Sequence, residues 1–307
     1  MAALVEVPFE VQKPQAGLRV DQFLSQRLQR YSRAQVQRMI YEGKVFLRGR
    51  RAKASLRLIA GDTVVVKYPK TIEPECRFPS LPVVFEDEYL LAVNKPGDLL
   101  SHPTDKIVEN AATSILKKQF PATRLFLTHR LDRETSGVLL FAKSSAAARK
   151  MSALFAGRGV KKTYLAIVRG RVVWKKLRVD QPLGREGLGI YVRQKTGSGQ
   201  PAVTEFSLLE CGKSASLVSA RPLTGRLHQI RVHLAHVGHP ILGDKLYTGA
   251  GELYMKTVNG TLTKDDLAAL GAERQMLHAA SVAFAHPMTG EALLIEAAMP
   301  ADFRLPL

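Results

Sequence analysis

Residues 128–143 read THRLDRETSGVLLFAK and join a polar loop directly to an apolar strand. The first ten of these residues carry hydroxyl, imidazole, guanidinium and carboxylate groups, more than a simple connection between two elements needs. The run Val138–Lys143 that follows has the length and composition of a buried strand. Strand-like and helix-like runs surround this stretch without regular alternation. We therefore predict an α+β domain with a mixed, largely antiparallel sheet and flanking helices.

This predicted domain covers residues 83–303. Further strand-like runs occur at Tyr89–Asn94, Tyr164–Val168, Val203–Glu210 and Ser216–Arg221, and helical periodicity occurs at about 107–119, 144–156, 226–237 and 263–270. In a doubly wound parallel sheet each strand would be followed by a helix, and these strands are not.

A smaller domain is predicted in front of it. Residues 18–42 show the apolar spacing of two short helices, and Val45–Leu47 and Thr63–Tyr68 have the composition of strands. We predict a compact helix–helix–strand domain at 17–70. Residues 71–82 contain three prolines and little periodicity, so they are predicted to be a linker.

The charge of the chain is strongly positive and clustered. Its 307 residues carry 45 Lys and Arg against 27 Asp and Glu, a net charge of +18. Residues 19–57 hold eleven basic and two acidic groups, and residues 138–179 hold eleven basic groups and no acidic one. Charge that served only solubility would have no reason to concentrate, whereas such clusters favour binding of a polyanion, usually nucleic acid or a membrane surface. The candidate contacts to such a polyanion in the N-terminal domain are Arg33, Arg38, Lys44, Arg48, Arg50, Arg51 and Lys53.

Composition excludes several classes of protein. No apolar run reaches the roughly 18–20 residues that a membrane span requires, and the N-terminus MAALVEVPFEVQ lacks the basic start of a secretory signal. Cys76 and Cys211 have no ligand-like spacing, so we expect neither a disulfide framework nor a cysteine zinc site. We expect a cytoplasmic protein that has no membrane partner and functions as a monomer.

Asp132 is the candidate for chemistry in the opening loop. Arg130 and Arg133 flank it, and nearby guanidinium groups keep a carboxylate ionised near neutral pH. An ionised aspartate serves as a nucleophile or as an electrostatic stabiliser, since a general acid needs a raised pKa. A capping or salt-bridged loop is the alternative interpretation for an isolated aspartate.

The segment TGRLHQIRVHL, residues 224–234, predicts a helix with Arg231 at the edge of its apolar face. A guanidinium group near a core needs an anion, because an unpaired buried charge is very costly, and Asp132 is a candidate partner. The nearby histidines are His228, His233, His236 and His239. Their helical angles scatter widely, so we predict no metal site and keep a metal-dependent RNA hydrolase only as a weak alternative.

Tyr164 enters a strand within the acid-free stretch. Its ring could stack on a nucleobase, although a half-buried strand tyrosine is the commoner case. The sequence contains no phosphate-binding GxxxxGK[ST] loop and no GxSxG elbow, and its glycines at 184–189 lack the context of a dinucleotide site. We therefore predict no cofactor.

Taken together, these segments resemble the RNA pseudouridine synthases that act on large-subunit ribosomal RNA and some transfer RNAs. The resemblance spans about 83–303 and rests on HRLDRETSG at 129–137, KTYLAIVRG at 162–170 and TGRLHQIRVHLAHVGHPILGDKLY at 224–247. Residues 17–68 resemble the alpha-L RNA-binding domain that often precedes this catalytic domain. Residues 181–202 match nothing in the family pattern.

The resemblance implies roles for individual residues. Asp132 is implied to be the catalytic aspartate, Tyr164 the tyrosine that stacks on the target base, and Arg231 the arginine that pairs with the aspartate. Substrate-binding roles are implied for His129, Arg130, Arg226 and Ile230. In related enzymes the arginine matched by Arg130 fills the gap left by the flipped nucleotide, and the residue matched by Ile230 lines the base pocket.

The implied reaction converts uridine to pseudouridine without a cofactor. Whether the aspartate acts at C6 of the base or at the sugar stays open, and both schemes need an ionised carboxylate and a uridine flipped out of its stack. We expect large-subunit ribosomal RNA as the substrate, with transfer RNA as the alternative. The charge clusters alone would also fit a non-catalytic RNA-binding or ribosome-assembly factor.

Overall fold

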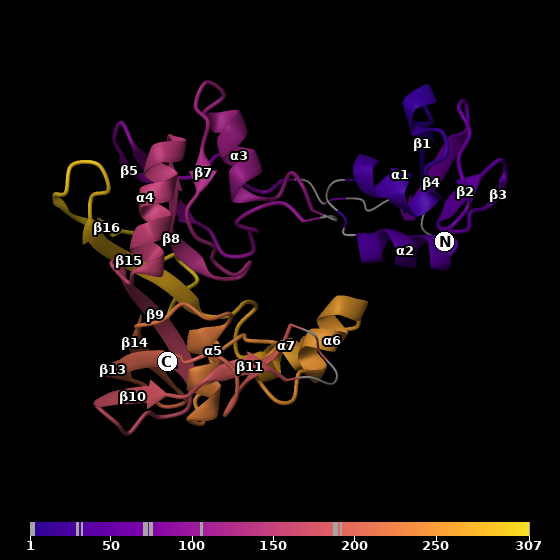
Figure 1. Cartoon of the computed structure of the whole chain (residues 1–307). Helices are drawn as coiled ribbons and strands as arrows, with labels where there is room; N and C mark the ends of the chain where they lie inside the picture. Colours follow the sequence, from indigo (N-terminus) through magenta and orange to yellow (C-terminus); the bar gives the residue numbers. More distant parts are fainter. Residues whose placement is uncertain are drawn as a thin grey trace. The chain divides into compact units, whose positions relative to one another are not determined.

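The computed structural model describes residues 4–28, 31, 33–69, 73, 76–104, 107–186, 190 and 192–306. The chain divides into two compact units, Met1–Pro74 and Glu75–Leu307 (Figure 1). Four positions of the predicted linker, 71, 72, 74 and 75, lie outside the described residues. Leu81, near the end of that linker, is buried in a core of the second unit, so this part of the segment belongs to the folded unit.

The first unit combines a four-stranded antiparallel sheet with two helices. The strands occur in the order β1 (Leu4–Glu10), β4 (Thr63–Pro69), β2 (Val45–Leu47) and β3 (Arg50–Arg51), and the helices are α1 (Val20–Arg27) and α2 (Arg33–Tyr41), after a 3-10 turn at Lys13–Gln15. Phe23 of α1 and Val36 of α2 share one core with Val64 and Val66 of β4. The unit begins before residue 17 because β1 pairs with β4 along its whole length.

The second unit is built on one large sheet. Along its main path the strands are β10 (Lys176–Asp180), β13 (Val203–Cys211), β14 (Ala215–Pro222), β9 (Lys161–Arg169), β15 (Leu277–Ala285), β8 (Ser136–Ala142), β6 (Leu90–Lys95) and β5 (Val83–Glu86). β16 (Ala292–Glu296) pairs with β15, and β7 (Phe126–Leu127) pairs with β8. Among the described strands only β8 and β15 pair in parallel, which confirms the predicted α+β class with a mixed, largely antiparallel sheet.

Helices cover both faces of the sheet at β6 and β8. Leu90 and Ala92 of β6 share a core with α4 (Ser145–Ala156), whereas Leu91 and Val93 share another core with α3 (Ala112–Gln119). Figure 1 shows α3 and α4 flanking β8. Because both faces are covered, the two strands are continuous apolar runs in the sequence rather than alternating ones.

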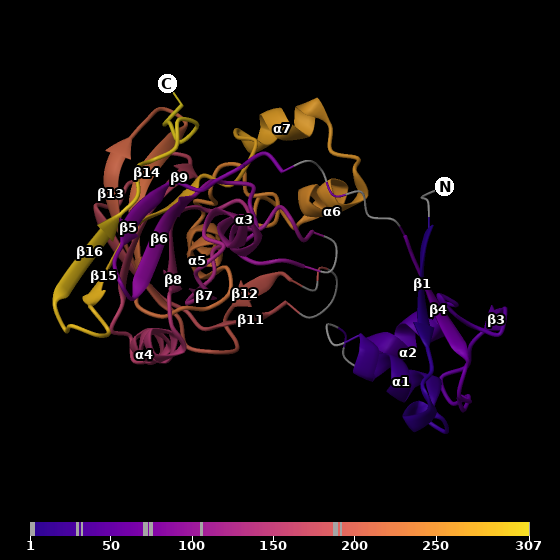
Figure 2. The same ribbon diagram turned by 90° about the horizontal axis from the view of Figure 1, so that it is seen from above.

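The remaining described elements of the second unit lie outside this large sheet. They are α5 (Gln229–His236), the hairpin of β11 (Leu183–Arg185) and β12 (Gln194–Thr196), α6 (Glu252–Asn259) and α7 (Lys264–Leu270). Figure 2 shows α3, α5 and the hairpin on one side of strands β13, β14 and β9. No helix among the described residues is long and apolar enough to span a membrane.

The helix predicted at 226–237 begins later in the structure, at Gln229. His228 has a φ of 56°, in the left-handed region, and this conformation ends the turn in front of the helix. The Gln229 side chain accepts the backbone N–H of Arg226 at 3.0 Å and the hydroxyl of Thr224 at 2.7 Å. Arg226 and Leu227 are therefore carried by a fixed turn rather than by the helix.

Candidate active site

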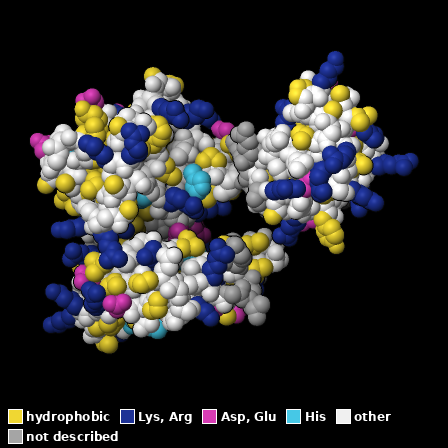
Figure 3. All heavy atoms as spheres, in the orientation of Figure 1, with side chains coloured by type: hydrophobic (Ala, Val, Ile, Leu, Met, Phe, Trp, Pro, Cys, Tyr) yellow, Lys and Arg dark blue, Asp and Glu magenta, His cyan; other side chains and the backbone are white. Residues whose placement is uncertain are grey.

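A large cavity of about 1780 Å³ opens on the second unit beside the loop between β7 and β8. Figure 3 shows that face of the unit hollowed, with basic and histidine side chains around the hollow. The cavity is lined by every residue predicted to be catalytic or substrate-binding: His129, Arg130, Asp132, Tyr164, Arg226, Ile230 and Arg231. The fold thus gathers residues that are distant in the chain, such as Asp132 and Arg231, which lie 99 positions apart.

Buried side chains hold the backbone of the Asp132 loop. The Ser101 hydroxyl donates to the carbonyl of Leu131 at 2.8 Å and accepts the N–H of the same residue at 3.0 Å. The fully buried ammonium group of Lys95 donates to the carbonyl of Arg133 at 3.1 Å. Burial lowers the pKa of Lys95 to about 7, against the attraction of Asp132, which raises it. The backbone is therefore fixed on both sides of Asp132.

Arg231 is shared between two carboxylates. Its Nη1 donates to Oδ2 of Asp132 at 2.7 Å, while its Nε and Nη2 donate to the two oxygens of Asp244 at 2.7 and 2.9 Å. Asp244 is fully buried and also accepts the N–H groups of Leu246 and Tyr247. The guanidinium fork is thus locked by Asp244 and presents its remaining edge to Asp132. The predicted Asp132 partner of Arg231 is confirmed, and Asp244 is a second partner.

The Asp132 carboxylate is held ionised. Burial alone would raise its pKa, but the positive charge and hydrogen bond of Arg231 outweigh burial and lower the pKa below its usual value. The side chain keeps 30% of its surface exposed and lines the cavity. At neutral pH Asp132 is therefore an anion open to a ligand in the cavity, which suits a nucleophile or an electrostatic stabiliser.

Tyr164 lies on β9, opposite Ala220 of β14 and Ala279 of β15. It packs against two of the apolar cores and also lines the cavity. Burial and the negative charge of Asp132 raise the pKa of Tyr164 above the usual range for tyrosine. At neutral pH the residue therefore offers a flat ring and a protonated hydroxyl to a ligand.

His228 and Tyr247 support the Asp132–Arg231 pair from a second side. Nε2 of His228 lies 3.9 Å from Oδ2 of Asp132, and its Nδ1 lies 2.9 Å from the Tyr247 hydroxyl. The Arg231 guanidinium lies over the Tyr247 ring, 5.1 Å from its centroid. Burial and the charge of Arg231 lower the pKa of His228 to about 4, so its imidazole is neutral and leaves Arg231 as the cation beside Asp132.

The predicted substrate-binding residues occupy different depths of the cavity. Nε2 of His129 accepts a backbone N–H of β8 at 3.2 Å, and burial lowers the pKa of His129 to about 4. Ile230 is buried in the wall, whereas Arg130 is exposed. Arg226 donates through Nε to the carbonyl of Pro201 at 3.1 Å. The wall is thus neutral at His129 and positively charged at the two arginines.

The histidines between 228 and 239 contact separate partners. His228 lies against Tyr247, His233 against Thr204, His236 against Thr196, and His239 against the carbonyl of Arg169. In the part of the chain that the structure describes, no group of three or more His, Cys, Asp or Glu is arranged to hold a metal ion. Cys76 and Cys211 are free thiols. The geometry therefore gives no support to a metal-dependent hydrolase.

The basic residues predicted to contact RNA in the first unit fall into two groups. Ion pairs join Arg33 to Asp21, Arg48 to Asp62, and both Arg38 and Lys44 to Glu42. Since Asp21 and Asp62 are buried, their arginine partners also stabilise the unit. Arg50, Arg51 and Lys53 are exposed and form no ion pair within the described residues, so their charge is free for a ligand.

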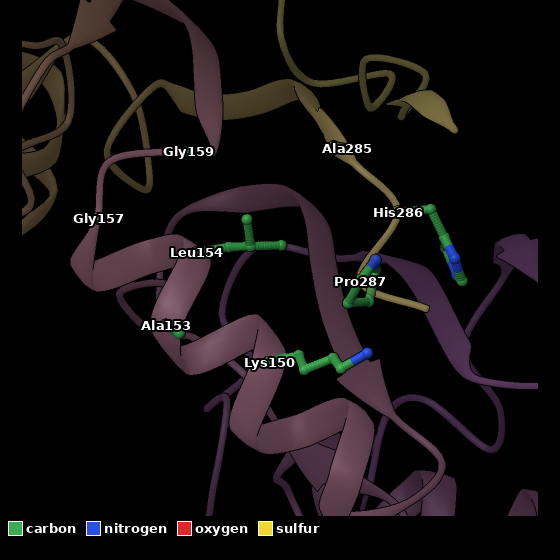
Figure 4. Close-up of a pocket in the computed structure, with 8 residues that line it drawn as sticks. All are labelled: Lys150, Ala153, Leu154, Gly157, Gly159, Ala285, His286 and Pro287. Atoms are coloured by element: carbon green, nitrogen blue, oxygen red, sulfur yellow. The ribbon is translucent and has the colours of Figure 1, made fainter. Parts of the chain in front are cut away.

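A second, smaller hollow lies away from these residues. It has a volume of about 410 Å³ and lies between α4 and residues 285–287 (Figure 4). Lys150 and Leu154 extend from α4 on one side, and Nε2 of His286 lies 3.0 Å from a carboxylate oxygen of Asp87. No residue of the Asp132 loop lines this hollow, so it is separate from the candidate active site.

Sequence reasoning missed Asp244, Tyr247 and Lys95 as parts of the site. The first two lie in GDKLY at 243–247, and an acid followed by an aromatic shortly after Arg231 was the available signal. The position of Lys95 next to Pro96 gives no sign that its ammonium group is buried under the Asp132 loop. Only the packing of separate segments reveals these contacts.

Both units of the chain resemble known proteins. Residues 89–236 match the family model for RNA pseudouridylate synthase, and residues 18–64 match the S4 domain. The chain is 35% identical over 305 residues to ribosomal large subunit pseudouridine synthase C of Vibrio cholerae, which covers 95% of this chain and 93% of that protein. It is 31% identical over 311 residues to ribosomal large subunit pseudouridine synthase D of Vibrio vulnificus, covering 98% and 94%.

Solved structures give the same result. Human RNA pseudouridylate synthase domain containing 1 superposes with a TM-score of 0.58 at 28% identity, covering 72% of this chain and 84% of that chain. The fold and the cavity therefore define an enzyme that isomerises a nucleoside within RNA. The chain belongs to the RNA pseudouridylate synthase family and carries an S4 domain in its first unit.

Proposed function

We propose that this protein converts uridine to pseudouridine in large-subunit ribosomal RNA, and that Asp132 is its catalytic residue. The observation that carries the proposal is the 2.7 Å ion pair between Asp132 and Arg231 in the wall of a large cavity that Tyr164 also lines. The relatives that align with both units are named ribosomal large subunit pseudouridine synthases, which favours ribosomal RNA over transfer RNA.

The residues of the cavity have different roles in the proposed reaction. The target uridine leaves its stack and enters the cavity, where its base stacks on Tyr164 and contacts Ile230. Asp132 acts on this nucleoside as an anion, while Arg231 keeps the carboxylate ionised and oriented. The N1–C1′ bond breaks and a C5–C1′ bond forms, the C5 proton leaves to solvent, and N1 gains a proton. Arg130 fills the gap in the RNA stack.

Flipping the uridine costs a few kcal/mol, which RNA binding must offset. Arg226 and Arg130 bring positive charge to the cavity, and His129 contributes a neutral wall. In the S4-containing unit, Arg50, Arg51 and Lys53 contact phosphates directly, and Arg33, Arg38, Lys44 and Arg48 add charge while paired with carboxylates. Such contacts bind RNA backbone without reading its sequence.

We infer that the protein acts as a cytoplasmic monomer. The residues proposed to be catalytic or substrate-binding all come from one chain and line one cavity, so no second copy is needed to complete it. The two thiols are free, which fits a reducing compartment.

The test measures tritium release from unmodified large-subunit ribosomal RNA that carries C5-tritiated uridine, with transfer RNA in parallel. We expect release from ribosomal RNA with the wild-type protein and none with Asp132→Asn, while RNA binding stays within about twofold. Asp180→Asn is the control, because Asp180 is exposed on β10 and does not line the cavity. Full activity of Asp132→Asn, or release from transfer RNA alone, would contradict the proposal.

A further inference from the structure

Several apolar side chains that line the active-site cavity are open to solvent. Leu227, Val192 and Val258 all line the cavity, with 51%, 37% and 61% of their surfaces exposed. Tyr254 lines the cavity too, one turn before Val258 on α6. Exposed apolar groups at a functional site gain free energy when a ligand covers them, so these side chains are candidates for a second contact with the substrate.

The lining of the cavity also carries a set of basic side chains. It includes Arg130, Arg158, Lys161, Lys162, Arg221 and Arg226. Basic groups of this kind bind phosphates, and apolar or aromatic side chains bind the faces of unstacked bases. A ligand that meets both surfaces combines an anionic backbone with flat apolar faces. A strand of RNA with more than one base out of its stack has that chemistry.

The size of the cavity points the same way. Its volume is about 1780 Å³, whereas sites for drug-sized molecules occupy roughly 300–1000 Å³. A single nucleoside is no larger than a drug-sized molecule, so it needs a site within that smaller range. The cavity therefore has room for a neighbouring nucleotide beside the one that reacts.

Helix α6 is braced although none of its residues is buried. The ammonium group of Lys256 pairs with Asp266 of α7 at 2.7 Å, and Tyr254 packs against the cluster that contains Tyr247. The ion pair fixes α6 against α7, and the packing of Tyr254 fixes it against the cluster that contains Tyr247. They leave Val258 exposed at the cavity, so α6 forms a fixed platform there rather than a loose segment.

We propose that α6, with Leu227 and Val192, forms a second base-binding subsite, which holds an unstacked nucleobase next to the target uridine in the same RNA strand. The proposal rests on the proposed function, since it places the reacting uridine beside Asp132 and its neighbour against Val258. Apolar contact and stacking read the face of a base rather than its hydrogen-bonding edge. The subsite therefore selects an unpaired nucleotide rather than a particular base.

The experiment uses the full chain and a large-subunit ribosomal RNA fragment that contains the mapped target uridine. Val258→Asn removes the apolar contact, and we expect it to raise the Kd for this RNA about fivefold with a nearly unchanged single-turnover rate at saturating RNA. Val258→Phe enlarges the face and is expected to lower the Kd. The matched control is Met255→Asn, because Met255 lies on the same helix, is 43% exposed and does not line the cavity.

An abasic nucleotide, placed in turn at each position beside the target, identifies the bound base. At one position the missing base should weaken wild-type binding, and there Val258→Asn should add no further loss. Equal binding by Val258→Asn and Met255→Asn, while the wild type still forms pseudouridine, overturns the subsite alone. A defect of Val258→Asn that requires ribosomal proteins would assign the face to a protein partner and overturn it too. A wild type without activity overturns the proposed function and the subsite together.

Discussion

At the scale of single residues, the position of the Asp132 carboxylate depends on a group outside the cavity. Asp244 does not line the cavity, yet its two oxygens lock the Arg231 guanidinium that bonds to Asp132. Buried ion pairs add little net stability compared with apolar packing, but they impose geometry. We therefore regard Arg231 and Asp244 as groups that position the carboxylate proposed to be catalytic.

Arg231→Lys tests this positioning. A lysine keeps the charge but cannot bridge two carboxylates with a planar fork, so Asp132 loses its fixed orientation. We expect the rate of pseudouridine formation to fall about a hundredfold, as misplacement of a reacting group does, with RNA affinity within about threefold. Single-turnover kinetics and filter binding measure the two quantities. Arg178→Lys, which alters an arginine paired with Asp180 and Glu205 and absent from the cavity lining, should leave the rate nearly unchanged.

His129 gives the molecule a pH-dependent stability. Its folded-state pKa of about 4 lies below the usual 6.5, so the unfolded chain binds more protons between these values. Stability is therefore fully present above about pH 6.5 and is lost as the pH falls toward 4. Urea unfolding should show that His129→Gln, which keeps a hydrogen-bond acceptor but does not titrate, loses on the order of 2 kcal/mol less than wild type between pH 7.5 and pH 5. Parallel losses in the two proteins would contradict this.

At the scale of secondary structure, local sequence pattern predicted those elements whose own residues carry the composition or periodicity of a strand or a helix. β6, β8, α4 and α7 lie close to the predicted strands and helices. β15 was not predicted, because its sequence LHAASVAFA is rich in alanine, which favours helix over strand. It becomes a strand through pairing with β8, β9 and β16, contacts that lie far away in the chain.

The parallel contact between β8 and β15 requires a glycine at position 137. Gly137 has a φ of +113°, and a Cβ there would lie 2.2 Å from the carbonyl oxygen of Ala279. We expect Gly137→Ala to lower the free energy of unfolding by about 3 kcal/mol or more. Gly238→Ala has a similar positive φ of +82° but nothing within 4 Å, and should cost about 1–2 kcal/mol. Thermal unfolding of both variants checks this, and equal losses would refute the steric explanation.

At the scale of the whole molecule, clustered charge predicted a polyanionic partner, and the fold shows that only some of the basic residues are free to bind it. Arg33 and Arg48 are bound to buried carboxylates in the first unit. Composition could not distinguish such arginines from the free ones, because the partners Asp21 and Asp62 are distant in sequence. Helical spacing placed Arg231 at the edge of an apolar face and so indicated that it needs an anionic partner, but it gave no sign of Asp244 as the second one.

The free charges of the first unit should govern salt-sensitive binding. We expect Arg50→Glu with Arg51→Glu to weaken binding of ribosomal RNA about tenfold at low salt and much less at high salt, since fewer counterions are released. Arg48 is kept, because its reversal would place a glutamate beside buried Asp62. Lys13→Glu, outside this basic turn, is the comparison. An unchanged slope of log Kd against log salt concentration in the double variant would count against the turn as an RNA contact.

The most direct measurement is a map of pseudouridines in cellular RNA with the gene present, deleted, and restored as wild type or as Asp132→Asn. We predict that deletion removes pseudouridine at defined positions of large-subunit ribosomal RNA, that the wild-type gene restores them, and that Asp132→Asn does not although the protein accumulates to the same level. An unchanged large-subunit map after deletion, or restoration by Asp132→Asn, would contradict Asp132-dependent pseudouridine formation in ribosomal RNA.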